Sequence, residues 1–177
     1  MNSAFFGLLY ARKFRRFWFL LLLFSGAHTS SAAERQDALW PNTTYDERIP
    51  TFNEVLGYKV GEKITSYADM LRYFEALESA APERIKTFEY GRTWEGRKLI
   101  YAAIGNSQSI SNLDALSLGM QQLTEPDFAG ADALIAALPA TVWLAYGVHG
   151  NEISSTDAAM LTAYHLLAAI NEPISRK

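Results

Sequence analysis

An apolar run that ends in glycine and is followed by a helix-like segment constrains the fold of this chain most. Residues 141–146 (Thr-Val-Trp-Leu-Ala-Tyr) are nearly all apolar, which is typical of a strand buried on both faces of a largely parallel sheet. Gly147 follows, and a helical pattern begins at Ser154 and stops at Pro173. We expect one side of this helix to be formed by Ala158, Leu161, His165 and Ala168. The sequence therefore predicts a strand–turn–helix unit of an α/β domain.

The turn of this unit contains His149, Asn151 and Glu152. A histidine and a glutamate three residues apart, between a strand and a helix, can direct an imidazole nitrogen and a carboxylate oxygen at one ion. Functional groups of open α/β sheets lie at the carboxyl ends of strands, and an anion is favoured near a helix N-terminus. His149 and Glu152 are thus candidate zinc ligands. Asn151 either contacts a substrate or satisfies the backbone of the turn.

Other polar residues nearby are given structural interpretations. His165 lies about 20 Å along the helix from Glu152, so we expect it to pack rather than to bind the same metal. Asp157 and Glu54 have no partner at a defined spacing and are expected to be solvated. The Ser and Thr residues at 154–156 are explained by capping of the helix start, because no histidine base is placed to activate them.

The first 33 residues have the order of a secretory signal peptide. Four basic residues between Arg12 and Arg16 precede an apolar run at 17–24, and small residues follow up to Ala33. The apolar run is shorter than the roughly 20 residues of a spanning helix. We therefore expect cleavage near Ala33 and export to the periplasm or the extracellular space, with an uncleaved membrane anchor as the alternative.

Charge and cysteine content exclude two classes of site. Residues 34–177 contain 12 basic and 19 acidic residues, a net charge of about −7, and no basic stripe that would follow a phosphate backbone. This argues against nucleic acid as a partner. The chain has no cysteine, which excludes disulfides and thiolate ligands. The sequence gives no indication of the oligomeric state.

Residues 34–63 are expected to form an extended amino-terminal arm, since prolines and glycines interrupt any long periodic pattern. The first clear helix is predicted to begin at Ser66, which has capping-box spacing to Asp69, and to end at Pro82. Its apolar stripe is expected to face the core. The stripe consists of Tyr67, Met70, Leu71, Phe74 and Leu77.

A hairpin is predicted to follow this helix. Residues 85–90 and 98–104 have strand patterns, and a glycine-bounded loop at 91–97 joins them. The next segment, 107–139, has the composition of an insertion, with weak helical patterns at 113–123 and 131–138. Nothing in its sequence indicates a function.

Together these features carry a resemblance to a known family. The hairpin loop with Gly91-Arg92 and Gly96-Arg97, the strand ending at Ile104-Gly105, and the segment from Trp143 to Glu152 resemble the zinc carboxypeptidase family of metallopeptidases, in an exported bacterial branch. The likeness runs from about residue 64 to 169. It implies an α/β fold, with residues 64–177 forming the truncated amino-terminal part of a mixed, mainly parallel sheet that has helices on both faces.

The resemblance also implies the chemistry. His149 and Glu152 match the first two zinc ligands of the family's H-x-x-E motif, and the third ligand and the general base would lie beyond Lys177. The implied reaction is zinc-dependent hydrolysis of a peptide bond at the carboxyl end of a peptide or protein. Many relatives have an arginine where this chain has Asn151. With two ligands, the 177-residue chain is expected to bind Zn²⁺ weakly and to have negligible activity by itself.

Three alternatives remain open from the sequence. The same H-x-x-E motif occurs in related zinc deacylases, which cleave N-acyl amino acids, although the hairpin favours the peptidase. The chain could instead be a non-catalytic envelope module that retains the fold. The stop at Lys177 could also reflect an incomplete gene model, in which the sequence is cut short of the full protein.

Overall fold

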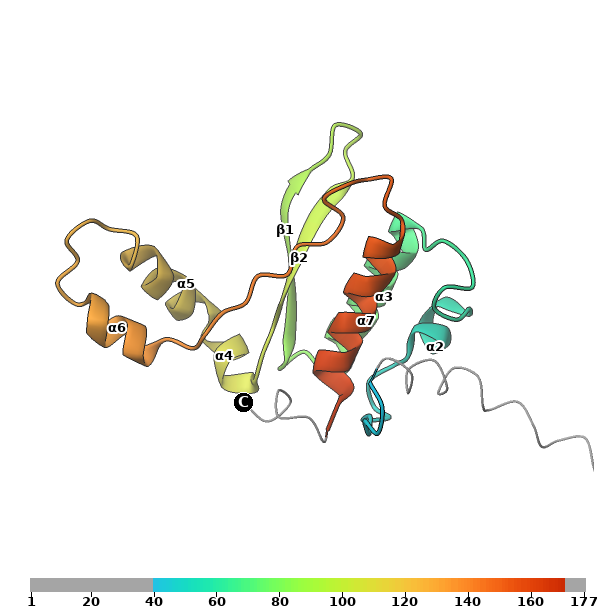
Figure 1. The fold of residues 1–177 in the computed structure, drawn as a ribbon, viewed down its shortest axis with the longest axis horizontal. Helices are drawn as coiled ribbons and strands as arrows, with labels where there is room; N and C mark the ends of the chain where they lie inside the picture. The colour runs from blue at the N-terminus through green and yellow to red at the C-terminus, as the bar shows by residue number, and fades with distance from the viewer. Residues whose placement is uncertain (1–39, 171–177) are drawn as a thin grey trace, which may run out of the picture. The chain divides into compact units, whose positions relative to one another are not determined.

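The computed structural model describes residues 40–170, so the expected leader at 1–33 lies outside the described residues. The chain divides after Asn42 into two compact units, and the description that follows concerns the second unit. It is a mixed α/β arrangement (Figure 1). The elements in order are α2 (Phe52–Leu56), α3 (Tyr67–Ala80), β1 (Ile85–Arg92), β2 (Lys98–Ile104), α4 (Ser107–Ser111), α5 (Leu113–Gln122), α6 (Ala131–Ala137) and α7 (Ser154–Ala168). Among the described residues, no helix is both long and apolar enough to cross a membrane.

Helix α3 begins where the sequence predicts. The hydroxyl of Ser66 accepts a hydrogen bond from the backbone N–H of Asp69 at 3.1 Å, and the helix ends just before Pro82. This bond satisfies one of the free N–H groups at the helix start. The side of the helix that faces the core includes the predicted Phe74 and Leu77, together with Tyr73.

The predicted hairpin is confirmed, with a first strand that extends to Arg92. β1 and β2 pair antiparallel in a register that sets Ile85 opposite Ile104, with an irregularity between Glu89 and Gly91. Alternate side chains point to opposite faces. One face of β2 packs against the core through Ile100, Ala102 and Ile104. On the other face, the rings of Phe88 and Tyr101 stack with centroids 4.9 Å apart.

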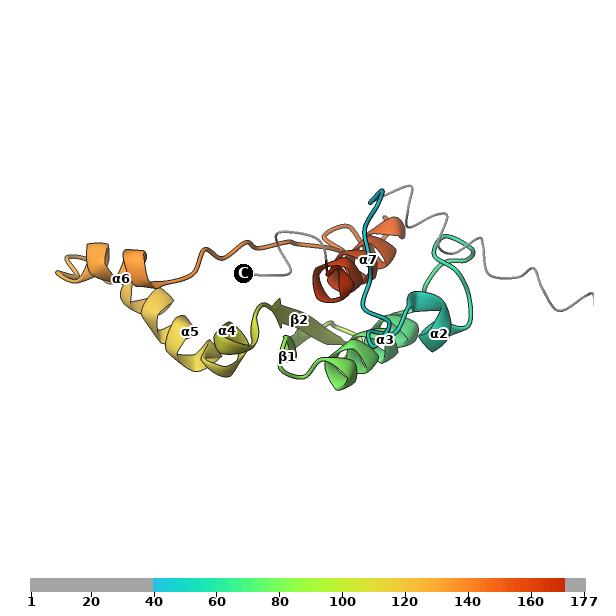
Figure 2. The same cartoon turned by 90° about the horizontal axis from the view of Figure 1, so that it is seen from below.

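A single hydrophobic core lies between the long helices and the hairpin. Helix α7 packs against α3 and β2, and α3 packs against β1, as the two views in Figures 1 and 2 show. Of the predicted side of α7, His165 and Ala168 are buried and Leu161 is half-buried, whereas Ala158 is exposed. The largest fully buried side chains are Tyr73, Leu77, Ile85, Met160 and Leu167.

The arm expected at 34–63 is not wholly extended in its described part. Helix α2 has a capping box, in which the Glu54 N–H donates to the Thr51 hydroxyl at 3.3 Å and the Thr51 N–H donates to the Glu54 carboxylate at 2.7 Å. Glu54 is therefore bonded rather than simply solvated. Phe52 and Leu56, one helical turn apart, are buried in the core. This short helix thus belongs to the packed unit.

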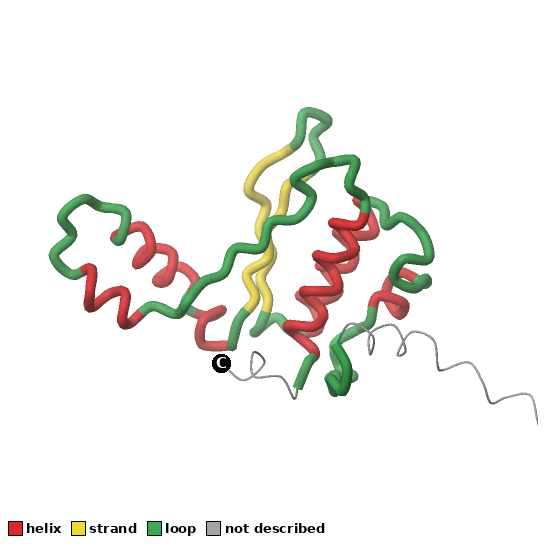
Figure 3. Tube along the Cα trace, viewed as in Figure 1, coloured by secondary structure: helices red, strands yellow, loops and turns green. Residues whose placement is uncertain are grey.

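The strand predicted at 141–146 is wrong. In this structure the segment has no regular secondary structure, and it runs as a loop between α6 and α7 (Figure 3). Val142 and Trp143 are 78% and 76% exposed. A strand needs a neighbouring strand to pair its backbone groups, and the strands of the described region pair only with each other. A two-stranded antiparallel sheet therefore stands where a mainly parallel sheet was expected.

The segment 107–139 is helical. Helices α5 and α6 confirm the two weak patterns, while α4 was not predicted. The Asn106 side chain caps α4 by accepting the Ser109 N–H at 2.8 Å. A Cβ placed on Gly119 of α5 would lie 3.1 Å from the side chain of Leu138. The absence of a side chain at this position allows the close approach of the segment that follows α6.

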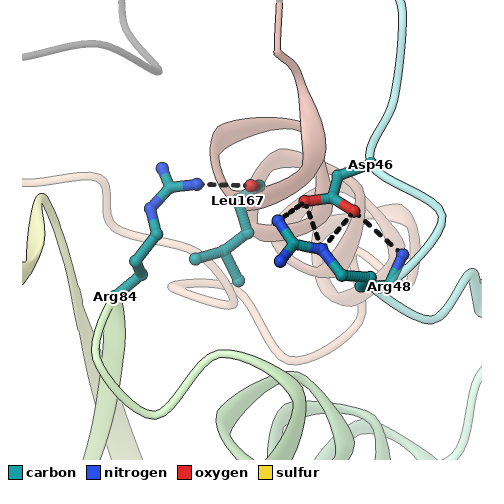
Figure 4. Close-up of polar contacts among 4 residues, drawn as sticks. All are labelled: Asp46, Arg48, Arg84 and Leu167. Carbon is teal, nitrogen blue, oxygen red and sulfur yellow. Dashed lines mark hydrogen bonds and ion pairs between the residues drawn. The ribbon is translucent and has the colours of Figure 1, made fainter.

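The carboxyl end of α7 is held by two earlier segments (Figure 4). The Arg84 guanidinium donates to the carbonyls of Leu167 and Leu166 at 2.6 and 3.0 Å, and the Asp46 N–H donates to the carbonyl of Ala168 at 2.7 Å. These bonds satisfy carbonyls that have no partner within the helix. Hydrogen bonds from Arg48 lower the pKa of the Asp46 carboxyl to about 2. The helix that follows the candidate site is therefore fixed at its far end.

Candidate metal centre

His149, Asn151 and Glu152 lie in one turn immediately before α7. The backbone N–H of Glu152 donates to the carbonyl of His149 at 3.1 Å, and the N–H of Ser155 donates to the carbonyl of Glu152 at 3.2 Å. These two backbone hydrogen bonds connect the turn to the first residues of α7. The structure thus places the candidate ligands at a helix N-terminus, where a carboxylate is electrostatically favoured.

Gly147 fixes the start of this turn. Its φ of 70° is in the left-handed region, which side chains disfavour and glycine adopts without cost. A Cβ at this position would meet nothing within 4 Å, so the requirement for glycine comes from the backbone conformation and not from space. The N–H of Gly147 donates to the hydroxyl of Ser155 at 2.7 Å.

The loop around the candidate ligands is held by hydrogen bonds rather than by packing. Residues 147–154 are all exposed. Just before them, the Tyr146 hydroxyl donates to the Thr162 hydroxyl at 2.9 Å. Both Tyr146 and Gly147 are therefore bonded to side chains of α7, which sets the position from which the loop departs.

Asp157, in the first turn of α7, differs from expectation. One of its carboxylate oxygens is buried and has no hydrogen-bond partner, so the prediction that Asp157 is solvated is wrong.

Tyr58 interacts electrostatically with Asp157 and Asp69. Burial raises the pKa of Tyr58, and the negative charges of Asp69 and Asp157 raise it further. The Tyr58 hydroxyl donates to the carboxylate of Asp69 and is hydrogen-bonded to the Thr65 hydroxyl, each at 3.2 Å.

The donor chemistry of the turn fits zinc in part. An imidazole nitrogen and a carboxylate oxygen are both common zinc ligands, and His149 and Glu152 are exposed, so a hydrated ion can reach them. Across residues 40–170, however, no three His, Cys, Asp or Glu side chains form a group that could hold a metal. The described chain therefore offers two ligands, and a protein zinc site takes at least three.

His165 lies near the other end of α7 and packs as expected. It is 9% exposed, and its Nδ1 atom is 3.1 Å from the Tyr45 hydroxyl. The ring of Tyr45 also stacks on Tyr164 at 5.2 Å between centroids. His165 therefore contributes to the contact between α7 and the segment before α2.

The role of Ser155 was missed in the sequence. The hydroxyl residues at 154–156 were expected to cap α7, but the cap position is Ile153, and no side-chain hydrogen bond is made from it. Ser155 instead accepts a bond from Gly147, which precedes the candidate ligands. The sequence signal for such a contact is weak, because a serine in the first turn of a helix is usually explained by capping.

A family model described as zinc carboxypeptidase matches residues 70–176. The matched range includes the hairpin, the helical segment 107–139, the turn with His149 and Glu152, and α7. No curated protein and no solved structure matches the chain.

Proposed function

The chain belongs to the zinc carboxypeptidase family, and on this premise we propose that it serves zinc-dependent hydrolysis of peptide bonds at the carboxyl end of peptides or proteins. One observation carries the proposal. The family match spans the turn that contains both His149 and Glu152 at the start of α7. The family match at this turn makes the H-x-x-E pair a more specific signal than the spacing alone.

The residues of the turn have distinct proposed roles. His149 and Glu152 hold the zinc ion as two of its ligands, and Asn151, which is exposed between them, contacts the substrate. Zinc, when bound, supplies Lewis-acid polarisation of a carbonyl and activation of water. Gly147 allows the backbone to enter the turn, since its φ is positive. We assign no general base within the described residues.

Zinc titration tests the proposed ligands. Calorimetry of the 177-residue chain should detect weak binding of one Zn²⁺, and either His149→Ala or Glu152→Ala should abolish it. Val148→Ala serves as the matched control, because Val148 is 75% exposed in the same turn and offers no metal donor. Zinc binding that survives both ligand substitutions would refute the proposal.

Turnover is expected to be negligible for the chain as purified, because the described residues provide only two ligands. Carboxyl-terminal hydrolysis of blocked peptides that disappears in His149→Ala would contradict this expectation while supporting the peptidase assignment. Assays with N-acyl amino acids should run in parallel. Hydrolysis confined to those compounds would indicate the deacylase alternative.

We also propose that residues 1–33 export the protein and are removed near Ala33. The order of basic, apolar and small residues supports this. Mass spectrometry of the exported product should find Glu34 or a neighbouring residue at the amino terminus. An intact chain in the membrane fraction would instead indicate an uncleaved anchor.

A further inference from the structure

We propose that Ser155 is a positioning residue for the two candidate zinc ligands. It accepts the hydrogen bond that closes the loop carrying His149 and Glu152. The inference rests on the proposed function, because it gives Ser155 a role only if those two side chains bind zinc. Three features of the structure support it.

The first feature is the geometry of the bond. The Gly147 N–H and the Ser155 hydroxyl oxygen are 2.7 Å apart, which is short for an N–H···O bond. The two residues are eight positions apart, and both candidate ligands lie between them. This bond from a hydroxyl on a packed helix thus joins the beginning of the loop directly to its end.

The second feature is the lack of packing around the loop, which leaves hydrogen bonds to hold it. Residues 147–154 are all exposed, so burial of apolar surface does not determine their conformation. The turn bond between Glu152 and His149 orders the centre of the loop, but it does not attach the loop to the helix at its start. That attachment comes from the Ser155 hydroxyl, and the hydrogen bond from Tyr146 to Thr162 supports it just before the loop.

The third feature is the position of Ser155 itself. It is the second residue of α7 and half-buried, and α7 is anchored in the core by Met160 and Leu167, which are almost fully buried. A hydroxyl in the first turn commonly serves the N–H groups of its own helix. Here the Ser155 hydroxyl accepts a hydrogen bond from the loop instead, so the packed helix α7 holds the segment that contains the candidate ligands.

The test compares two adjacent serines. Ser155→Ala removes the acceptor, and alanine is the best helix former, so α7 should be retained. Ser154→Ala is the matched control, because Ser154 is exposed and lies outside the loop closure. Ser155→Thr keeps the hydroxyl and should rescue binding. The zinc-induced shift of the His149 imidazole proton resonance reports the dissociation constant at the ligand itself.

We expect Ser155→Ala to weaken zinc binding about fivefold, which is the typical effect of one lost hydrogen bond, while Ser154→Ala and Ser155→Thr bind as the unmodified chain does. Circular dichroism should show unchanged helix content in all variants. Unchanged zinc affinity in Ser155→Ala, with binding lost in His149→Ala, would overturn the positioning role alone. Loss of zinc binding together with helix content would assign Ser155 a purely structural role. Binding that persists in His149→Ala would remove the proposed function as well.

Discussion

At the scale of single residues, the backbone at Gly147 is the most restrictive feature of the candidate site. The loop contains two glycines, Gly147 and Gly150, and at neither would an added Cβ meet an atom within 4 Å. Only Gly147 has a positive φ, of 70°. Because an added side chain would be crowded at neither position, a comparison of the two glycines isolates the effect of backbone strain at Gly147.

Gly147→Ala should lower the free energy of unfolding by about 1 kcal/mol or shift the loop out of its turn, since a side chain disfavours the left-handed region. Gly150→Ala should leave both stability and loop conformation unchanged. Urea unfolding gives the first quantity, and amide chemical shifts of residues 147–152 give the second. Equal effects of the two substitutions would contradict the assigned strain.

Glu54 provides a pH-dependent test at the start of α2. Hydrogen bonds from the backbone and the hydroxyl of Thr51 lower the pKa of Glu54. A carboxyl with a lowered pKa in the folded state contributes stability above its unfolded pKa, near 4.3, and this contribution disappears as the pH falls through the folded value. Glu54→Gln should therefore flatten the decline of stability below about pH 4. Thermal unfolding across pH measures this difference. If the stability of the unmodified chain and of Glu54→Gln falls in parallel as the pH is lowered, the capping box is not formed.

At the scale of elements, the structure depends on how α7 is terminated. Arg84 is partly buried and donates to two carbonyls at the last turn of this helix. A cation at a helix C-terminus is also favoured by the helix dipole. This contact joins the start of the hairpin to the helix that carries the candidate site at its other end.

Arg84→Ala should lower the free energy of unfolding by about 2 kcal/mol, because hydrogen bonds from a charged donor are lost and carbonyls are left without partners. Arg97→Ala is the matched control. The Arg97 side chain is 58% exposed and pairs with an exposed glutamate, so its loss should cost less than about 0.5 kcal/mol. If chemical denaturation shows that the two substitutions lower the free energy of unfolding by similar amounts, the contact of Arg84 with the end of α7 does not stabilise the fold as proposed.

Several elements with local signals were predicted from sequence, although α2 and α4 were missed despite their capping residues, and the segment that depends on distant partners was predicted wrongly. Helix α3 and the hairpin follow from a capping residue, an apolar period and a glycine-bounded loop. The segment 141–146 has the composition of a buried strand, but its pairing depends on other strands, and none pairs with it in the described residues. The roles of Ser155 and Asp157 also depend on which segment lies against them, which the local pattern does not encode.

At the scale of the whole molecule, the second unit combines a packed core with an apolar segment that is exposed. Val142, Trp143 and Val148 are each at least 75% exposed. A contiguous apolar stretch of this kind promotes association. We therefore expect the chain to have poor solubility and to self-associate.

Trp143→Ser should reduce self-association measured by sedimentation velocity. Trp94→Ser is the matched control, because Trp94 is also fully exposed but stands alone in the polar hairpin loop, and single exposed apolar residues are ordinary. A sharp, cooperative thermal transition in a monomeric sample of the unmodified chain would contradict the expectation.

We propose that His149 and Glu152 converge on one zinc ion, and diffraction from crystals of the zinc-loaded protein at the zinc absorption edge tests this most directly. We expect an anomalous peak about 2.1 Å from both an imidazole nitrogen of His149 and a carboxylate oxygen of Glu152. A peak at any other place, or two side chains that point apart with no peak between them, would contradict it.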